Sequence, residues 1–224
     1  QMAAIKNPEE IATYSTVRKE NPDGLIFANL GSEASVDQAK RAVDMLEANA
    51  LQIHLNVIQE LTMPEGDRDF KGALNRIEQL VNELDIPVIV KETGFGISRE
   101  AAMKLQSINV AAIDVGGFGG TNFAAIENER RKRKLAYFND WGVPTAAALI
   151  ETSNLNSGIP VLASGGIQHA LDMVKCLSLG ASAVGLAGKV LNTLVEEGEL
   201  ATMEEIKEIN EGLTMLMVSL GANT

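Results

Sequence analysis

The stretch VLASGGIQHALDMVKCLSLGASAVGLAG, Val161–Gly188, contains one complete unit of strand, helix and strand. Short apolar runs at Pro160–Ala163 and Ala183–Leu186 predict two strands that are buried on both faces. The apolar residues of Ala170–Leu179 recur at helical spacing and predict a helix between them. Two neighbouring strands joined through a helix run parallel, with a right-handed crossover. This stretch therefore predicts an α/β fold with a parallel sheet.

The same unit recurs along the chain. The other predicted strands are Leu25–Asn29, Leu51–Leu55, Val88–Lys91 and Ala111–Val115. The other predicted helices are Val36–Ala48, Phe70–Leu84, Arg99–Ile108, Val143–Thr152 and Val190–Glu197, and a C-terminal helix covers EEIKEINEGLTMLMVSLGA. Alternation of this kind is typical of an open doubly wound sheet or of a closed (β/α)8 barrel.

The residues at the strand ends favour the barrel. Each of the six ends is polar or rich in glycine: Asn29 and Gly31; His54 and Asn56; Lys91, Glu92 and Gly94; Asp114, Gly116 and Gly117; Ser164, Gly165 and Gly166; Leu186, Ala187 and Gly188. A doubly wound sheet gathers such residues at one switch point, whereas the rim of a barrel draws them from many strands. We therefore predict one domain over residues 1–224 with a TIM-type (β/α)8 barrel fold. Six modules are visible, so two more, about 60 residues or more, are expected before Gln1, and the chain is expected to be incomplete at its N-terminus.

Composition excludes several classes of protein. Of the 224 residues 46% are apolar and 22% are charged, and no apolar run approaches the roughly 20 residues that span a bilayer, so a cytoplasmic location is expected. The net charge of −11 argues against general binding to nucleic acid or to anionic lipid. The single cysteine, Cys176, excludes a disulfide framework, and its place in a helical pattern predicts a core residue.

Two glycine-rich loops follow the last two predicted strands. Gly165 and Gly166 let the backbone approach an anion closely, and a helix that begins near His169 adds its positive dipole end. The following loop, with Leu186 and Ala187, repeats the arrangement. Paired late loops of this kind form a phosphate site in many barrels, although glycine also serves ordinary tight turns.

A lysine and a second glycine-rich loop follow the middle strands. Lys91 ends a strand, and its ammonium group there either points into a partly desolvated cavity or reaches outward to solvent. The loop GGFGGT, residues 116–121, allows a ligand to approach its backbone, and Thr121 offers a hydroxyl group or caps a helix. The loop resembles a dinucleotide fingerprint only loosely, because the acidic residue that should follow is absent.

The segment HLNVIQE, residues 54–60, places four polar side chains at one strand end and in the loop expected after it. Glu60 offers the carboxylate that Mg²⁺ usually takes together with substrate phosphate and water. His54, Asn56 and Gln59 offer groups that bind a diphosphate or a reacting carbon. The plainer interpretation is a polar loop that ends at Pro64.

These segments together resemble the type 2 isopentenyl diphosphate isomerases, which are FMN-dependent enzymes of isoprenoid synthesis. The resemblance rests on HLNVIQE, VIVKETGFG, DVGGFGGTNFAAIENER, FNDWG and the two late glycine loops, and it runs over nearly the whole chain. It implies a (β/α)8 fold, FMN and Mg²⁺ as cofactors, NADPH as the reductant of the flavin, and a homotetramer. The implied reaction interconverts isopentenyl and dimethylallyl diphosphate, with reduced FMN as the acid and base. The family's N-terminal segments, which bring basic residues to the diphosphate, lie outside these residues.

The resemblance also implies a role for each site residue. His54, Asn56 and Gln59 bind the substrate, with His54 and Gln59 as the catalytic candidates; Glu60 binds Mg²⁺; Lys91 lies near the flavin ring; Thr121 contacts FMN; and Gly165, Gly166, Leu186 and Ala187 hold its phosphate. One departure is Gln168, which stands where similar enzymes often have an arginine, so backbone amides are expected to carry more of the phosphate binding.

Two alternatives share the late phosphate loops. An FMN-dependent 2-hydroxy acid oxidase or dehydrogenase would resemble its family in a histidine and an arginine near the sixth strand of the barrel, where this chain has Gly-Gly-Thr-Asn-Phe, residues 119–123. A non-catalytic barrel that binds FMN or another phosphate compound would not need Gln59, Glu60 and Lys91 together.

Overall fold

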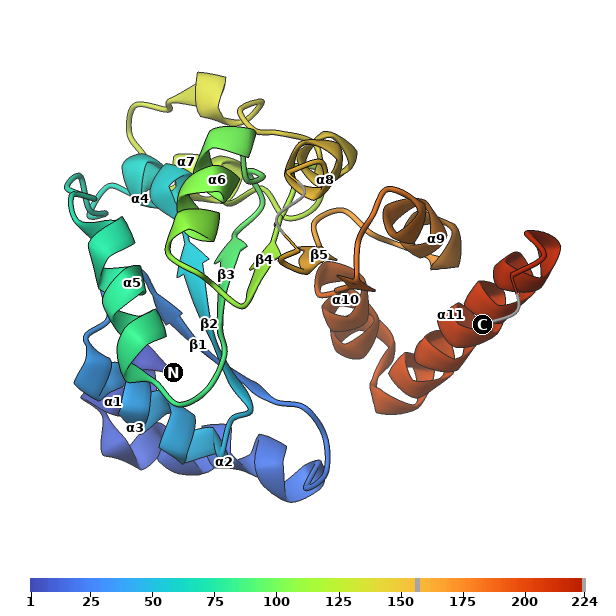
Figure 1. The fold of residues 1–224 in the computed structure, drawn as a ribbon, viewed down its shortest axis with the longest axis horizontal. Helices are drawn as coiled ribbons and strands as arrows, with labels where there is room; N and C mark the ends of the chain where they lie inside the picture. The colour runs from blue at the N-terminus through green and yellow to red at the C-terminus, as the bar shows by residue number, and fades with distance from the viewer. Residues whose placement is uncertain (156–157, 223–224) are drawn as a thin grey trace.

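A computed structural model describes residues 1–155 and 158–222, and six parallel strands form a single sheet at its centre (Figure 1). The strands are β1 Phe27–Gly31, β2 Ala50–Leu55, β3 Val88–Glu92, β4 Ala112–Asp114, β5 Val161–Ala163 and β6 Ala183–Val184. Their order in the sheet is their order in the chain, and each pairs with the next in parallel. A doubly wound sheet reverses its order at a switch point. This sheet does not reverse, so the singly wound arrangement of a barrel is confirmed.

Helices alternate with the strands. Before β1 lie α1 Met2–Lys6, the 3₁₀ turn η1 Pro8–Glu10 and α2 Ile11–Glu20; then follow α3 Val36–Leu46, α4 Val57–Thr62, α5 Ala73–Glu83, α6 Arg99–Ser107, α7 Phe123–Glu129, η2 Ala136–Phe138, α8 Thr145–Ser153, α9 Ala170–Ser178, α10 Gly188–Glu197 and α11 Glu199–Ser219. The long α11 extends to one side, where it packs against α9 and α10 (Figure 1). Among the described residues no helix combines the length and the apolarity that crossing a bilayer requires.

Several boundaries differ from the prediction for local reasons. Gln59 and Glu60, expected in a loop, lie in α4, which has only six residues and so shows too little periodicity to be recognised. The helix expected from Phe70 begins at Ala73, because Gly72 adopts a left-handed conformation with φ of 73°. The side chain of Asn122, rather than Thr121, caps α7 by accepting a hydrogen bond from the N–H of Ala125 at 2.9 Å.

The two faces of the sheet carry different side chains, because successive residues of a strand point to opposite faces. On the outer face Leu51, Ile53 and Val90 are fully buried in the main core, together with apolar residues of α3, α5 and α6. On the inner face a small apolar layer around Ala50, Ile89 and Ala112 lies nearer the start of the strands. The positions that follow on this face are polar and lie near the carboxyl ends: Gln52, His54, Lys91, Asp114 and Ser164.

A buried carboxyl group organises the loop after β3. Glu92 is 8% exposed, and its carboxylate accepts hydrogen bonds from the backbone N–H groups of Phe95 and Gly96. Gly94 and Gly96 also donate to the carbonyl oxygen of Gly116, at 2.9 and 3.0 Å, which joins this loop to the one after β4. Burial raises the pKa of Glu92 to about 7 against the opposing effect of the backbone donors.

The raised pKa of Glu92 predicts a pH-dependent stability. Between the unfolded value of 4.5 and about 7 the folded state binds the proton more tightly, so the free energy of unfolding should fall as the pH rises through this window. At about 1.4 kcal/mol per pKa unit, the loss attributable to this group is on the order of 3 kcal/mol. In Glu92→Gln this part of the pH dependence should disappear, as measured by urea unfolding across the window. Glu78→Gln, which removes an exposed carboxylate from α5, is the control. If Glu92→Gln unfolds with the same pH profile as the unmodified protein, the side chain is not protonated in the folded state.

Candidate active site

A cavity of about 830 Å³ opens at the carboxyl ends of the strands. This size lies within the range of about 300 to 1,000 Å³ that small-molecule sites occupy. Residues from the ends of all six strands line it: Asn29, Gln52, His54, Gln59, Lys91, Thr93, Gly94, Asp114, Gly116, Gly117, Gly119, Gly120, Thr121, Phe123, Ser164, Gly165, Gly166, Ile167, Gln168, Gly185, Leu186, Ala187, Gly188 and Asn192. Eight of the ten predicted site residues are among them.

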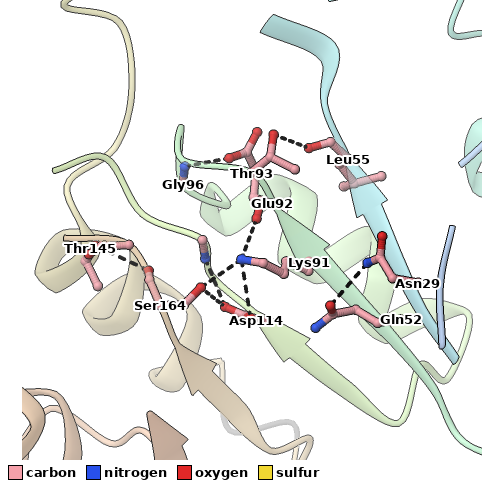
Figure 2. A network of polar contacts seen from close by, with 12 residues as sticks. Asn29, Gln52, Leu55, Lys91, Glu92, Thr93, Gly96, Asp114, Thr145 and Ser164 are labelled. Atoms are coloured by element: carbon pink, nitrogen blue, oxygen red, sulfur yellow. Dashed lines mark hydrogen bonds and ion pairs between the residues drawn. The ribbon is translucent and has the colours of Figure 1, made fainter. Parts of the chain in front are cut away.

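Lys91 is held inside the cavity by a network that crosses β3, β4 and the loop after β5 (Figure 2). Its Nζ donates to Ser164 Oγ at 2.8 Å and to the carbonyl oxygen of Glu92 at 2.9 Å, and it lies 3.5 Å from Asp114 Oδ2. Ser164 Oγ in turn donates to Asp114 Oδ1 at 2.6 Å. The ammonium group therefore faces inward, and the interpretation of Lys91 as a lysine that reaches outward to solvent is wrong. Its side chain stays 27% exposed, so part of it remains open to a ligand.

His54 of β2 and Gln59 of α4 also line the cavity, and the register places His54 beside Lys91 on the neighbouring strand. His54 Nδ1 lies 2.9 Å from Asn29 Oδ1. Burial lowers the pKa of His54, so the imidazole is neutral at neutral pH. The cavity lining thus combines a neutral imidazole, an amide and the ammonium group of Lys91.

Asn56 and Glu60 lie beside the cavity, outside its lining. Asn56 Nδ2 donates to Glu60 Oε1 at 2.8 Å, and the N–H of Asp67 donates to Glu60 Oε2 at 2.9 Å. No group of three or more His, Cys, Asp or Glu side chains suited to a metal ion occurs in residues 1–155 and 158–222. Apart from Asp114, which is paired with Lys91, Glu60 is the carboxylate that the predicted site offers Mg²⁺, and most of the coordination shell of any such ion would come from ligand oxygens and water.

The glycine loops after β4 and β5 form a close backbone-to-backbone contact. A Cβ atom on Gly165 would lie 2.1 Å from the carbonyl oxygen of Gly117, and one on Gly166 would lie 2.6 Å from that of Gly119. Both Gly165 and Gly166 have positive φ values, 102° and 75°. In the described part of the chain, their N–H groups donate to no other residue. These donors line the cavity, where the N-terminus of α9 lies only a few residues further along the chain, and together they suit an anion such as the phosphate of FMN.

The sequence did not single out Gln52 or Thr93 and gave no role to Asp114 or Ser164. Gln52 precedes His54 by two residues, so the alternation of a strand places both on the same face. The alternation of the strand could therefore have identified Gln52 from the sequence. The sequence could not identify the partners of Asp114, because they depend on the register between strands, which pairs Lys91 with Asp114.

The chain is similar to known proteins over most of its length. Residues 22–224 match the family model of the FMN-dependent dehydrogenases. An isopentenyl-diphosphate delta-isomerase of Geobacillus sp. (strain WCH70) is 56% identical over all 224 residues, and one of Bacillus pumilus (strain SAFR-032) is 58% identical. The chain spans 64% and 63% of the lengths of these two relatives.

A solved structure supports the fold. A mutant flavocytochrome b2 with benzoylformate superposes with a TM-score of 0.64 over 88% of this chain and 51% of its own, at 19% sequence identity. At that identity the likeness concerns the fold alone, and it agrees with the singly wound parallel sheet. With the family model matching nine tenths of the sequence, the chain belongs to the family of FMN-dependent dehydrogenases.

Proposed function

We propose that this protein is a type 2 isopentenyl diphosphate isomerase, which interconverts isopentenyl and dimethylallyl diphosphate in isoprenoid synthesis. The observation that carries the proposal is one cavity with three features: the inward ammonium of Lys91, the neutral side chains of His54 and Gln59, and glycine loops whose N–H groups at Gly165 and Gly166 have no acceptor among the described residues. The identity of 56–58% to isomerases over the whole chain supports it.

The residues present fit FMN. In the proposal, the N–H groups of Gly165 and Gly166, together with Leu186 and Ala187, hold its phosphate, Thr121 contacts it, and Lys91 lies beside its ring. Reduced FMN would supply an electron-rich ring and a group that exchanges protons with an unactivated alkene. Gly120 and Gly166 approach so closely that a Cβ on Gly120 would lie 2.6 Å from the nitrogen of Gly166, so the two loops meet here backbone to backbone.

The chain's own residues bind and orient the substrate in this proposal. His54 and Gln59 hold the alkene part of the substrate, and Asn56 orients the carboxylate of Glu60, the proposed ligand of a diphosphate-bound Mg²⁺. Placing reacting groups in this way reduces the entropy cost of reaching the transition state. NADPH as the reductant of the flavin, a cytoplasmic location and a homotetramer complete the proposal; exposed apolar side chains of α11, Met215 and Val218, suit a subunit contact.

The activity can be tested directly with the full-length natural protein. With FMN, Mg²⁺ and NADPH under anaerobic conditions, it should convert isopentenyl diphosphate to dimethylallyl diphosphate, as followed by chromatography. With oxidised FMN and no reductant, turnover should be absent, because the electron-rich ring is then missing. If the yellow protein instead bleaches with lactate or glycolate, the 2-hydroxy acid oxidase alternative is correct. Binding of FMN with neither reaction would favour the non-catalytic barrel.

The phosphate loops predict a matched pair of glycine variants. Gly166→Ala places a methyl group 2.6 Å from the carbonyl oxygen of Gly119, which should spread the two loops and raise the Kd for FMN about tenfold or more, a loss of about 1.4 kcal/mol. Gly198→Ala imposes a similar backbone strain at φ of 90° but meets no atom within 4 Å, and it should bind FMN normally. Quenching of flavin fluorescence measures both. Equal affinities in the two variants would mean that the glycine contact does not hold the flavin.

The ammonium group of Lys91 allows its effect on stability to be separated from its effect on activity by mutation. Lys91→Met leaves the buried carboxylate of Asp114 without its partner, which should cost about 3–5 kcal/mol of stability. The double variant Lys91→Met with Asp114→Asn should recover much of this stability, because the unpaired charge is gone. Isomerase activity should remain about 100-fold or more reduced in both, since a fixed donor of charge stabilisation is lost. Recovery of activity together with stability would show that Lys91 serves the fold alone.

A further inference from the structure

Two amide side chains and an imidazole form a chain of hydrogen bonds on the inner faces of β1 and β2. Asn29 pairs with Gln52 across the two strands, and His54 follows Gln52 by two residues on the same face. Asn29 Nδ2 donates to Gln52 Oε1 at 3.2 Å, and Asn29 Oδ1 lies 2.9 Å from His54 Nδ1. Figure 2 shows Asn29 and Gln52 with the amide nitrogen of one directed at the amide oxygen of the other. All three residues line the cavity.

The donor and acceptor roles in this series of hydrogen bonds determine which nitrogen of His54 carries the proton. An amide oxygen only accepts hydrogen bonds, so the nitrogen that meets Asn29 Oδ1 must be an N–H. Within the described part of the chain, Nε2 has no hydrogen-bond partner. Burial, the largest influence on the ring, disfavours a second proton and lowers the pKa of His54. The charge of Lys91, its partner in the strand register, acts in the same sense, and the carboxylates of Glu33 and Glu60 oppose it without reversing it.

We propose that Asn29, itself oriented by Gln52, is a positioning residue that holds His54 as the neutral tautomer protonated at Nδ1, and so presents Nε2 to the cavity as an acceptor. In water the neutral imidazole favours the opposite tautomer, with the proton on Nε2. The two neighbouring strands therefore reverse an intrinsic preference, as the partners of a functional histidine commonly do.

This tautomer limits what His54 can bind. A bare Nε2 accepts a hydrogen bond or a proton from a protonated group of the ligand or from a water molecule on it. It cannot donate to an ionised phosphate oxygen while the ring is neutral. This consequence rests on the proposed function for the identity of the ligand, whereas the tautomer itself is a property of the protein alone.

The tautomer can be measured without substrate or activity. The protein is labelled with ¹⁵N-histidine, purified without a histidine tag, and its ring nitrogens are recorded by NMR at about pH 8, above the ordinary pKa of histidine. The described residues contain two histidines, His54 and His169, and the signals lost in His54→Gln belong to His54. We expect Nδ1 of His54 to show the chemical shift of a protonated nitrogen and Nε2 the far downfield shift of a bare one. The reverse assignment in the unmodified protein overturns the proposal.

Two variants test the role of Asn29. Asn29→Asp keeps an acceptor and removes the donor, so the tautomer should be retained, while Asn29→Ala should shift His54 toward the form protonated at Nε2. If Asn29→Asp instead switches the tautomer, then Asn29 of the unmodified protein donates to Nδ1 of His54 rather than accepting from it, and the proposal fails. It also fails if Asn29→Ala folds normally and leaves both shifts unchanged. Because neither readout involves the isomerase reaction, a failed isomerase assay would overturn the proposed function and leave this result intact.

Discussion

The ion pair between Lys91 and Asp114 is the interaction on which the site depends. A charged pair is stable at a cavity wall only when hydrogen bonds satisfy its remaining donors and acceptors. Here Ser164 lies between the two, accepting from Lys91 and donating to Asp114, and the N–H of Gly116 gives Asp114 a further donor at 3.1 Å. The pair thereby ties together three consecutive modules, each of which contributes one member of the network.

This arrangement follows from simple geometry. A strand alternates its side chains, and parallel strands in chain order place equivalent positions side by side. The inner face is therefore polar at one level across three neighbouring strands, because the register pairs His54 with Lys91 and Lys91 with Asp114. On β3 and β4 these polar residues follow Ile89 and Ala112 of the small apolar layer by two positions. One face of each strand can pack against helices while the other carries the site. The chemistry does not weaken the main core, because Leu51 and Val90 remain completely buried on the other face.

The sequence predicted the parts of this structure that depend on local pattern. Strands, most helices, the inward Lys91 and the glycine loops at Gly165 and Gly166 follow from apolar runs, helical spacing and residue type at strand ends. It missed what depends on neighbours. The six residues of α4 are too few to show a helical period, so Glu60 was expected in a loop, whereas it lies in a helix and accepts a hydrogen bond from Asn56. The links of Asp114 needed the strand register, which no local pattern contains.

The balance of charge in the cavity bears on how the proposed anion would be recognised there. In the part of the chain that the structure describes, the lining has one carboxylate, Asp114, and one ammonium group, Lys91, and these two are paired with each other. Gln168, at the phosphate loop, is uncharged. These residues therefore give the cavity no net positive wall that would attract an anion, and the net charge of the whole chain is −11.

The other groups that attract an anion are the fixed dipoles of backbone N–H groups and helix ends, which act over short distances only. Such binding requires the ligand to reach the backbone itself, and glycine is the residue that permits this approach. The close contacts of Gly165 and Gly166 with the loop after β4 therefore suit the proposed binding of an anion by backbone groups in a lining whose ammonium group is already paired.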